Sequence, residues 1–329
     1  MSEYTFELPL RITVSVGTPG VASNLPAAGA AATAAATPAD SALERVDIDL
    51  NYANRTGYDS GFLGIPVRLP ILNDEQRRNA ARNMMARAGE DDTILPYNHF
   101  SIVMNRRRQL AYYTVVNIDG AQSRSPQRSG DSWHFDPRIA QSEQIGEDLY
   151  RRNALDRGHL VRRLDPAWGS RAQALNGNND TFHFTNCSPQ HERFNQSNET
   201  WQGIENFLLA QATEGRKKLT IFTGPVLADD DPLYRGVRLP RFFWKVALFR
   251  KPDETLSVSA YLLDQTELIE GLERFDADEF QVTVEEISER TGLDFTYLTA
   301  DQVNLDQPGV ERFDAMPRVR LNRLRDVVL

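Results

Sequence analysis

Residues 155–160 read L-D-R-G-H-L, and residues 194–205 read F-N-Q-S-N-E-T-W-Q-G-I-E. The two stretches supply an imidazole and a guanidinium from His159 and Arg157, and a carboxamide and a carboxylate from Asn195 and Glu205. A neutral imidazole accepts a proton from water near neutral pH, and a guanidinium stabilises charge on phosphorus. With one divalent cation, these groups suffice to hydrolyse a phosphodiester bond.

Each of these side chains also has a structural interpretation. A lone histidine is more often structural, but the surrounding tetrapeptide D-R-G-H favours His159 as a general base. A carboxamide oxygen is a hard, neutral ligand that suits Mg²⁺, so Asn195 is the candidate metal ligand. Glu205 would then hold a metal-bound water. In the alternative interpretation, Asn195 caps a helix and Glu205 is a solvated charge.

The composition of the chain is that of a globular protein. It has 329 residues, 40% of them hydrophobic and 25% charged, which is enough to bury a sizeable core. Its one cysteine, Cys187, excludes an internal disulfide. The net charge of −9 is unfavourable for contacts with phosphates, but residues 151–171 contain six arginines and two aspartates, a balance of +4. This basic strip would attract an anionic substrate, unless it is only a solvated helix face.

The N-terminus lacks the basic leader and apolar run of a secretory signal. The acidic Glu3 and Glu7 also argue against a mitochondrial presequence. No stretch approaches the ~18 uninterrupted apolar residues that a membrane span needs. We therefore expect a cytoplasmic protein that has no contact with a membrane.

The sequence pattern divides the chain into four parts. Residues 1–25 form a strand-like arm, because residues 6–16 alternate apolar and other side chains. Residues 26–40 form an alanine-rich linker. Residues 41–93 are expected to be an extension that packs on the core, and residues 94–329 to be the main domain with a C-terminal tail.

Within the main domain the predicted strands and helices do not alternate regularly, which favours an α+β fold over a doubly wound parallel sheet. Strands are predicted at residues 99–104, 110–118, 218–222, 243–249 and 257–263. Helices are predicted at residues 74–88 after the cap residue Asn73, at 200–213, and at 284–291 before Gly292. The pair Leu160 and Val161 predicts a strand that follows His159.

Several motifs occur in one order along the chain. They are F-S-I-V-M-N-R at 100–106, D-R-G-H at 156–159, T-N-C-S-P-Q at 185–190, F-N-Q at 194–196 with Glu205, T-G-P-V at 223–226 and E-I-S-E-R-T-G-L-D-F at 286–295. In this order they resemble the DNA/RNA non-specific endonucleases, and the resemblance covers about residues 95–295.

The resemblance implies a ββα-metal nuclease fold of the α+β class, with a central and mostly antiparallel sheet flanked by helices. It implies hydrolysis of DNA and RNA without sequence preference, leaving a 5′-phosphate and a 3′-hydroxyl. By resemblance, His159 activates water, Asn195 is the sole direct ligand of Mg²⁺, for which Mn²⁺ may substitute, and Glu205 orients a metal-bound water. Arg157 would contact phosphate or help hold the site, and Asn186 would support His159 or the substrate. Ten positions separate Asn195 from Glu205, a longer spacing than the family pattern.

Two other functions stay open at this point. His183, Cys187 and His191 recur every fourth residue, which would align three zinc ligands on a helix, although Pro189 and Asn186 disfavour a helix there. The second alternative is a nucleic-acid-binding or scaffold protein with an inactive nuclease fold.

A non-specific nuclease in the cytoplasm would digest the genome of its own cell. We therefore expect regulation, with residues 1–44 as the segment that binds a regulatory protein by adding a strand to its sheet. A bacterial defence or toxin system is the setting that this predicts, and homodimerisation is compatible with the composition. An extension without any role is the alternative.

Overall fold

The computed structural model describes residues 48–127, 132–192, 208–210, 212, 217–251, 253–270, 278–302, 311–313 and 316–320. Leu43–Leu329 form one compact unit, and the strand-like arm and the whole linker belong to the separate unit Met1–Ala42, which lies outside the described residues. Asn195, Glu205 and most of the helix predicted at 200–213 also lie outside them.

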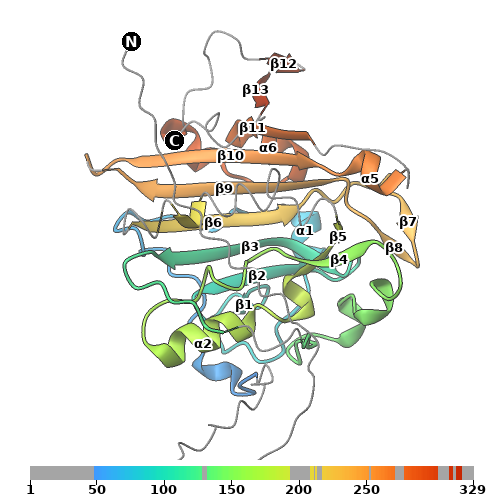
Figure 1. The fold of residues 1–329 in the computed structure, drawn as a ribbon, viewed down its shortest axis with the longest axis horizontal. Coiled ribbons are helices and arrows are strands. Elements are labelled where there is room, and N and C mark those ends of the chain that lie inside the picture. The colour runs from blue at the N-terminus through green and yellow to red at the C-terminus, as the bar shows by residue number, and fades with distance from the viewer. Residues whose placement is uncertain are drawn as a thin grey trace, which may run out of the picture. The chain divides into compact units, whose positions relative to one another are not determined.

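A nine-stranded sheet forms the centre of the described unit, and its neighbouring strands pair antiparallel in the order β1-β2-β3-β6-β9-β10-β11-β13-β12 (Figure 1). Its strands are β1 (Leu95–Pro96), β2 (Phe100–Asn105), β3 (Leu110–Asp119), β6 (Lys218–Pro225), β9 (Phe242–Arg250), β10 (Leu256–Asp264), β11 (Asp278–Val282), β12 (Glu311–Phe313) and β13 (Met316–Arg320). Two short ribbons accompany it, β4 (Leu155–His159) with β5 (Cys187–His191), and β7 (Leu233–Tyr234) with β8 (Val237–Arg238).

The helices are few and short. The α-helices are α1 (Asp74–Asn79), α2 (Arg171–Asp180), α5 (Thr266–Glu270) and α6 (Val284–Thr291). The 3₁₀ helices are η1 (Tyr52–Asn54), η2 (Gln141–Glu143), η3 (Glu147–Leu149), η4 (Phe184–Asn186) and η5 (Thr296–Asp301). A large antiparallel sheet with few helices confirms the predicted α+β class.

Both faces of the sheet are buried, which explains the long apolar runs of its central strands. In β9, Phe243 and Ala247 belong to one core cluster, whereas Trp244 and Val246 belong to the other. On the first face, the sheet packs against Leu160 and Val161, and β5 contacts β3. On the second face it packs against residues 62–80, α6 and η5. The candidate site lies next to the first face, because β4 ends at His159 and the next residue, Leu160, belongs to the core on that face.

Two local predictions need correction. The helix predicted at 74–88 ends at Asn79, because Ala80 and Ala81 are extended or bonded to the β2–β3 hairpin and almost fully buried against it. Its predicted cap Asn73 is confirmed, since its side chain and that of Gln76 form a capping box. No strand begins at Leu160 and Val161 as predicted; the strand at this position is β4, which ends at His159.

The helix at residues 284–291 begins and ends where the sequence predicts. The side chain of Thr283 accepts a hydrogen bond from the backbone of Glu286, and Gly292 adopts a left-handed conformation with φ of 67°. Among the described residues, no helix combines the length and the hydropathy that a bilayer crossing requires.

Candidate active site

His159 is the last residue of β4, where the β4–β5 ribbon ends. In the ribbon, His159 is opposite Cys187 and Gly158 is opposite Ser188. His159 is partly buried, with its Nε2 shielded from solvent, whereas Leu160, which follows it, is fully buried in the core. The ribbon therefore holds the imidazole just below the surface while the next residue anchors the backbone.

Two aromatic rings flank the imidazole. The ring centroid of Trp133 lies 4.6 Å from that of His159 with the planes tilted by 49°. Phe182 meets the imidazole edge to face, with centroids 5.0 Å apart and planes at 89°. These contacts restrict the rotation of the imidazole. No motif in the sequence predicts that Trp133, which is 26 residues before His159, contacts its ring.

Asn186 fixes the backbone that follows His159. Its carboxamide oxygen accepts a hydrogen bond from the Val161 N–H at 2.9 Å, and its amide donates to the carbonyl oxygens of Val161 at 2.8 Å and Thr181 at 3.0 Å. Its own carbonyl accepts from the Leu160 N–H at 3.0 Å. Asn186 is fully buried, so its side chain positions the backbone next to His159.

Arg157 forms an ion pair with Glu147. Its Nε donates to the Glu147 carboxylate at 2.9 Å and a terminal nitrogen donates to the other oxygen. The hydrogen bonds that Arg157 donates to the Glu147 carboxylate raise the pKa of Arg157. Both partners are partly exposed, so solvent screens the pair and its contribution to stability is small. The pair joins η3 to β4 on the side of the ribbon near His159.

Gly158 allows Gln190 to pack under the ribbon. A Cβ atom at position 158 would lie 2.1 Å from Oε1 and 2.3 Å from Cδ of Gln190. Gln190 is fully buried, and neither polar atom of its carboxamide has a hydrogen-bond partner among the described residues. The glycine of D-R-G-H is therefore required by close packing, and Gln190 is a neighbour of the site to which the sequence interpretation assigned no role.

Two of the three residues considered as zinc ligands, His183 and Cys187, have other contacts. His183 is fully buried, with the Tyr52 hydroxyl 2.7 Å from Nε2 and the Asp180 carbonyl oxygen 2.8 Å from Nδ1. The Cys187 thiol donates to the Tyr150 hydroxyl at 3.1 Å, and burial raises its pKa to about 12. Within the described ranges no group of three His, Cys, Asp or Glu residues could hold a metal ion.

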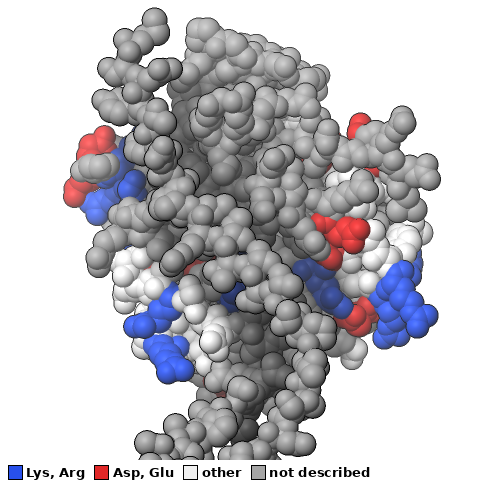
Figure 2. All heavy atoms as spheres, in the orientation of Figure 1, with Lys and Arg blue, Asp and Glu red and all other residues white. Residues whose placement is uncertain are grey.

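The basic strip at residues 151–171 is partly neutralised by local contacts. Arg157 pairs with Glu147, Arg151 lies 3.5 Å from the Asp148 carboxylate, and Arg163 donates to the Asn178 side chain. On the face shown in Figure 2, described basic and acidic side chains lie next to one another at the upper left and at the right, and basic side chains without acidic neighbours lie at the lower left.

The geometry agrees with comparisons to known proteins. A solved structure, "Crystal structure of the EndoG/EndoGI complex: Mechanism of EndoG inhibition", shares the fold with a TM-score of 0.50 and 20% identity, over 68% of this chain and 91% of that chain. The "Uncharacterized protein y4fB" of Sinorhizobium fredii is 40% identical over 270 residues, which are 76% of this chain and 40% of that protein. This chain thus spans about two fifths of the length of that relative. The family profile described as "DNA/RNA non-specific endonuclease" matches residues 78–302, and the chain belongs to this family.

Proposed function

We propose that this protein is a Mg²⁺-dependent endonuclease that hydrolyses DNA and RNA without sequence preference, with His159 as the general base. The observation that carries the proposal is the placement of a partly buried imidazole at the end of β4, beside a backbone segment held by Asn186. Family membership supports the reaction class, and the placement of His159 supports its role.

His159 acts on the water molecule that attacks phosphorus. Its neutral imidazole takes a proton from this water, and the resulting hydroxide forms the new P–O bond. The bond from phosphorus to the 3′ oxygen breaks, and the leaving oxygen takes a proton from solvent. The products carry a 5′-phosphate and a 3′-hydroxyl, and the imidazolium then releases its proton to solvent. The flanking rings of Trp133 and Phe182 hold the imidazole in one orientation during these steps.

Asn186 and Arg157 act as positioning residues in this proposal. The carboxamide of Asn186 is saturated by backbone groups, so it supports His159 and does not contact substrate. Arg157 is paired with Glu147, which favours its role in holding the site over direct contact with phosphate. A substrate phosphate would have to compete with the Glu147 carboxylate for the same guanidinium.

The proposed metal centre uses one protein ligand. Mg²⁺ keeps most of its waters and accepts a carboxamide oxygen, so Asn195 would bind it directly and Glu205 would hold one of its waters. Asn195 and Glu205 lie outside the described residues, so this part of the proposal rests on the chemistry of their side chains. When bound, Mg²⁺ or Mn²⁺ would stabilise negative charge on the leaving oxygen.

The decisive experiment compares His159→Asn with His99→Asn. His99 is a half-buried histidine stacked on Trp168 at 3.5 Å, and its φ of 68° is one that asparagine readily adopts. We expect His159→Asn to lower kcat on plasmid DNA by about 10²–10⁴-fold, and His99→Asn to lower it little. EDTA should abolish the activity of the unmodified protein, and Mg²⁺ or Mn²⁺ should restore it. Equal activity of His159→Asn and the unmodified protein would reject the role of His159; a complete lack of activity in the unmodified protein would favour the scaffold alternative.

We also propose that the activity is restrained by a protein partner in the cytoplasm, as part of a defence or toxin system. EndoG in the solved complex is bound by an inhibitor, and residues 1–44 of this chain carry the strand-like pattern. Deletion of residues 1–44 should change the nuclease rate in cell extract or the mass of the complex isolated from cells. If both are the same as for the full chain, this regulatory proposal is wrong.

A further inference from the structure

The turn between β2 and β3 carries three consecutive arginines, Arg106–Arg108, and lies against the end of α1. The Arg106 N–H donates to the Asn79 carbonyl oxygen at 3.0 Å, so the turn adjoins Arg78 of the same helix. Arg78, Arg106 and Arg107 are exposed, and among the described residues none of them forms an ion pair with a carboxylate. Three neighbouring arginine residues without a carboxylate partner are unexpected in a chain with a net charge of −9.

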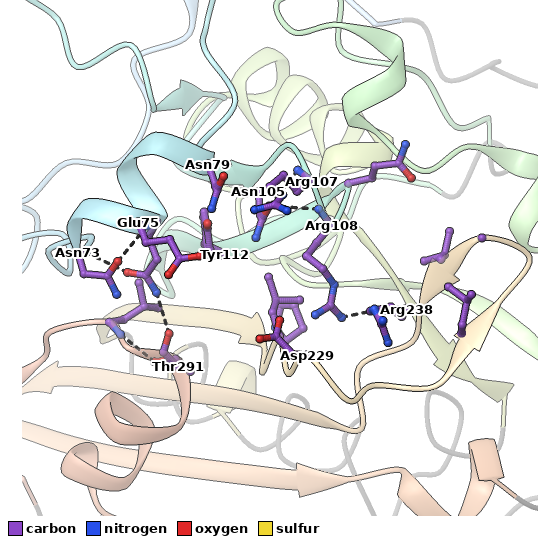
Figure 3. Close-up of a pocket in the computed structure, with 18 residues that line it drawn as sticks. Asn73, Glu75, Asn79, Asn105, Arg107, Arg108, Tyr112, Asp229, Arg238 and Thr291 are labelled. Atoms are coloured by element: carbon purple, nitrogen blue, oxygen red, sulfur yellow. Dashed lines mark hydrogen bonds between the residues drawn. The ribbon is translucent and has the colours of Figure 1, made fainter.

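A polar cavity of about 740 Å³ begins at this turn. Figure 3 shows the side chains of Arg107, Asn105, Asn79 and Tyr112 around it. Tyr112 is 8% exposed, and its hydroxyl has no hydrogen-bond partner among the described residues. Burial, with a smaller effect of Glu75, raises its pKa to about 12, so the hydroxyl stays protonated and can donate.

The charges around the cavity favour an anion on one side of it. Arg108 is neutralised by Asp231, whereas Arg238 donates only to backbone oxygen. Four guanidiniums at or beside the cavity have no carboxylate partner among the described residues, those of Arg107, Arg238, Arg78 and Arg106. Two carboxylates that line the cavity, those of Glu75 and Asp229, have no cationic partner among the described residues. Glu75 lies beside Tyr112 and Asp229 lies near Arg238 (Figure 3), so each carboxylate would oppose an anion at its own position in the cavity.

We propose that the arginine turn, Arg106–Arg108 with Arg78, is a second contact for the phosphate backbone of nucleic acid, separate from His159. This inference rests on the proposed nuclease function. Guanidiniums at such a contact neutralise phosphates without reading bases, which suits a substrate of any sequence. The Tyr112 hydroxyl and the Asn79 carboxamide add neutral hydrogen-bonding groups beside them.

A chain of contacts joins the turn to the candidate active site. The Gln109 side chain donates to the Ser142 carbonyl oxygen at 2.6 Å, and five residues later Glu147 pairs with Arg157. The extended reach of these segments sets an upper limit on the order of 50 Å between turn and site. At 3.4 Å per base pair, this is roughly fifteen base pairs. A duplex longer than this is therefore long enough to bridge both contacts.

The experiment measures DNA binding by fluorescence anisotropy in a His159→Ala background, so that the DNA stays intact. Duplexes of about 6 and about 30 base pairs are compared across a range of salt concentrations. The test variant adds Arg106→Ala and Arg107→Ala. The control adds Arg250→Ala and Lys251→Ala, which remove the same amount of charge away from the cavity. Phe243, near the start of β9, pairs with the cavity residue Pro225, whereas Arg250 is the last residue of β9. Glu75→Gln provides a change of opposite sign.

We expect the long duplex to bind more tightly than the short one in the background protein. Removing the two arginines should lower the magnitude of the slope of log K against log salt by about 1.8 for the long duplex, at about 0.9 per phosphate. Glu75→Gln should tighten binding of the long duplex. The inference would be overturned by an unchanged salt slope, by an equal decrease of the slope in the control variant, or by no binding of either duplex. An unchanged slope would instead favour an acidic protein as the partner of the turn. Digestion of the DNA by the His159→Ala protein would instead contradict the proposed function.

Discussion

His159 and His183 lie in neighbouring regions of the molecule but in opposite environments. Phe182 packs against the ring of His159 and directly precedes His183 in the chain. His159 is only partly buried, at the end of a two-stranded ribbon, whereas the ring of His183 is fully buried, with both nitrogens in hydrogen bonds. The degree of burial and the place in the fold, more than residue type, separate a candidate base from a structural histidine.

The region around His183 is a buried polar layer that ties residues 48–55 to the core. Asp136 and Arg138 form one buried ion pair, and Arg55 and Asp180 form another. The Tyr97 hydroxyl donates to Asp136. Burial by itself would raise the pKa of Asp136, but the hydrogen bonds and charge of Arg138 lower it. Such a layer specifies one arrangement of its members.

The largest effect on stability should come from breaking the buried pair beside His183. The side chains of Arg55 and Asp180 are 0% and 2% exposed, with a shortest contact of 2.7 Å. Arg55→Met keeps the apolar stem but leaves the Asp180 carboxylate without its cation, which should cost about 3–5 kcal/mol of unfolding free energy. Thermal denaturation should show a melting temperature lower by on the order of 10 °C.

Arg82→Met is the matched control for this change. Arg82 pairs with Asp92, and the side chains are 44% and 51% exposed. Loss of an exposed pair should cost less than about 1 kcal/mol. Similar melting temperatures for the two variants would show that burial does not distinguish the two regions in the way described.

A smaller effect on stability, but a clear one on activity, should follow from Gly158→Ala in the ribbon. The new Cβ would overlap the buried carboxamide of Gln190, so the end of β4 must shift and move His159 with it. Overpacking of this kind costs about 1–3 kcal/mol. Unfolding and kcat are measured together, and kcat should fall while the protein remains folded.

Gln190→Ala in combination with Gly158→Ala tests the cause. If the clash is responsible, the double variant should recover part of the activity that Gly158→Ala loses, and the two changes should not be additive. Additive losses would assign the effect to the backbone conformation of residue 158 instead.

The particular residues show why the sequence predicted some features and not others. The antiparallel sheet and α6 were predictable, because apolar runs, a Thr283 cap and Gly292 are local signals. The end of α1 could not be predicted, since alanine favours a helix and Ala80 is extended because it is buried and pairs with Asn105. The motif identified His159, but the Trp133 contact and the 125-residue separation between Arg55 and Asp180 depend on tertiary packing alone.

The smallest effect concerns pH and sharpens the comparison of the two histidines. Burial lowers the pKa of His183 below its ordinary 6.5, although the nearby Asp136 and Asp180 charges oppose this. The unfolded chain therefore binds a proton at a higher pH than the folded chain, so the contribution of neutral His183 is complete above pH 6.5 and is lost as pH falls through the lower folded pKa. Asp136, with a pKa below 3.8, keeps its full contribution until pH falls further.

Melting temperatures measured from pH 7.5 to 4.5 for the unmodified protein and for His183→Gln should separate these contributions. Below pH 6.5 the unmodified protein should lose stability more steeply than His183→Gln, which has no proton to gain at this position, although the variant starts from a lower melting temperature. His99, whose pKa is also lowered by burial, contributes the same slope to both proteins and cancels in the difference. Parallel curves would mean that the ring of His183 is not held neutral by its buried contacts, and the distinction from His159 would then rest on exposure alone.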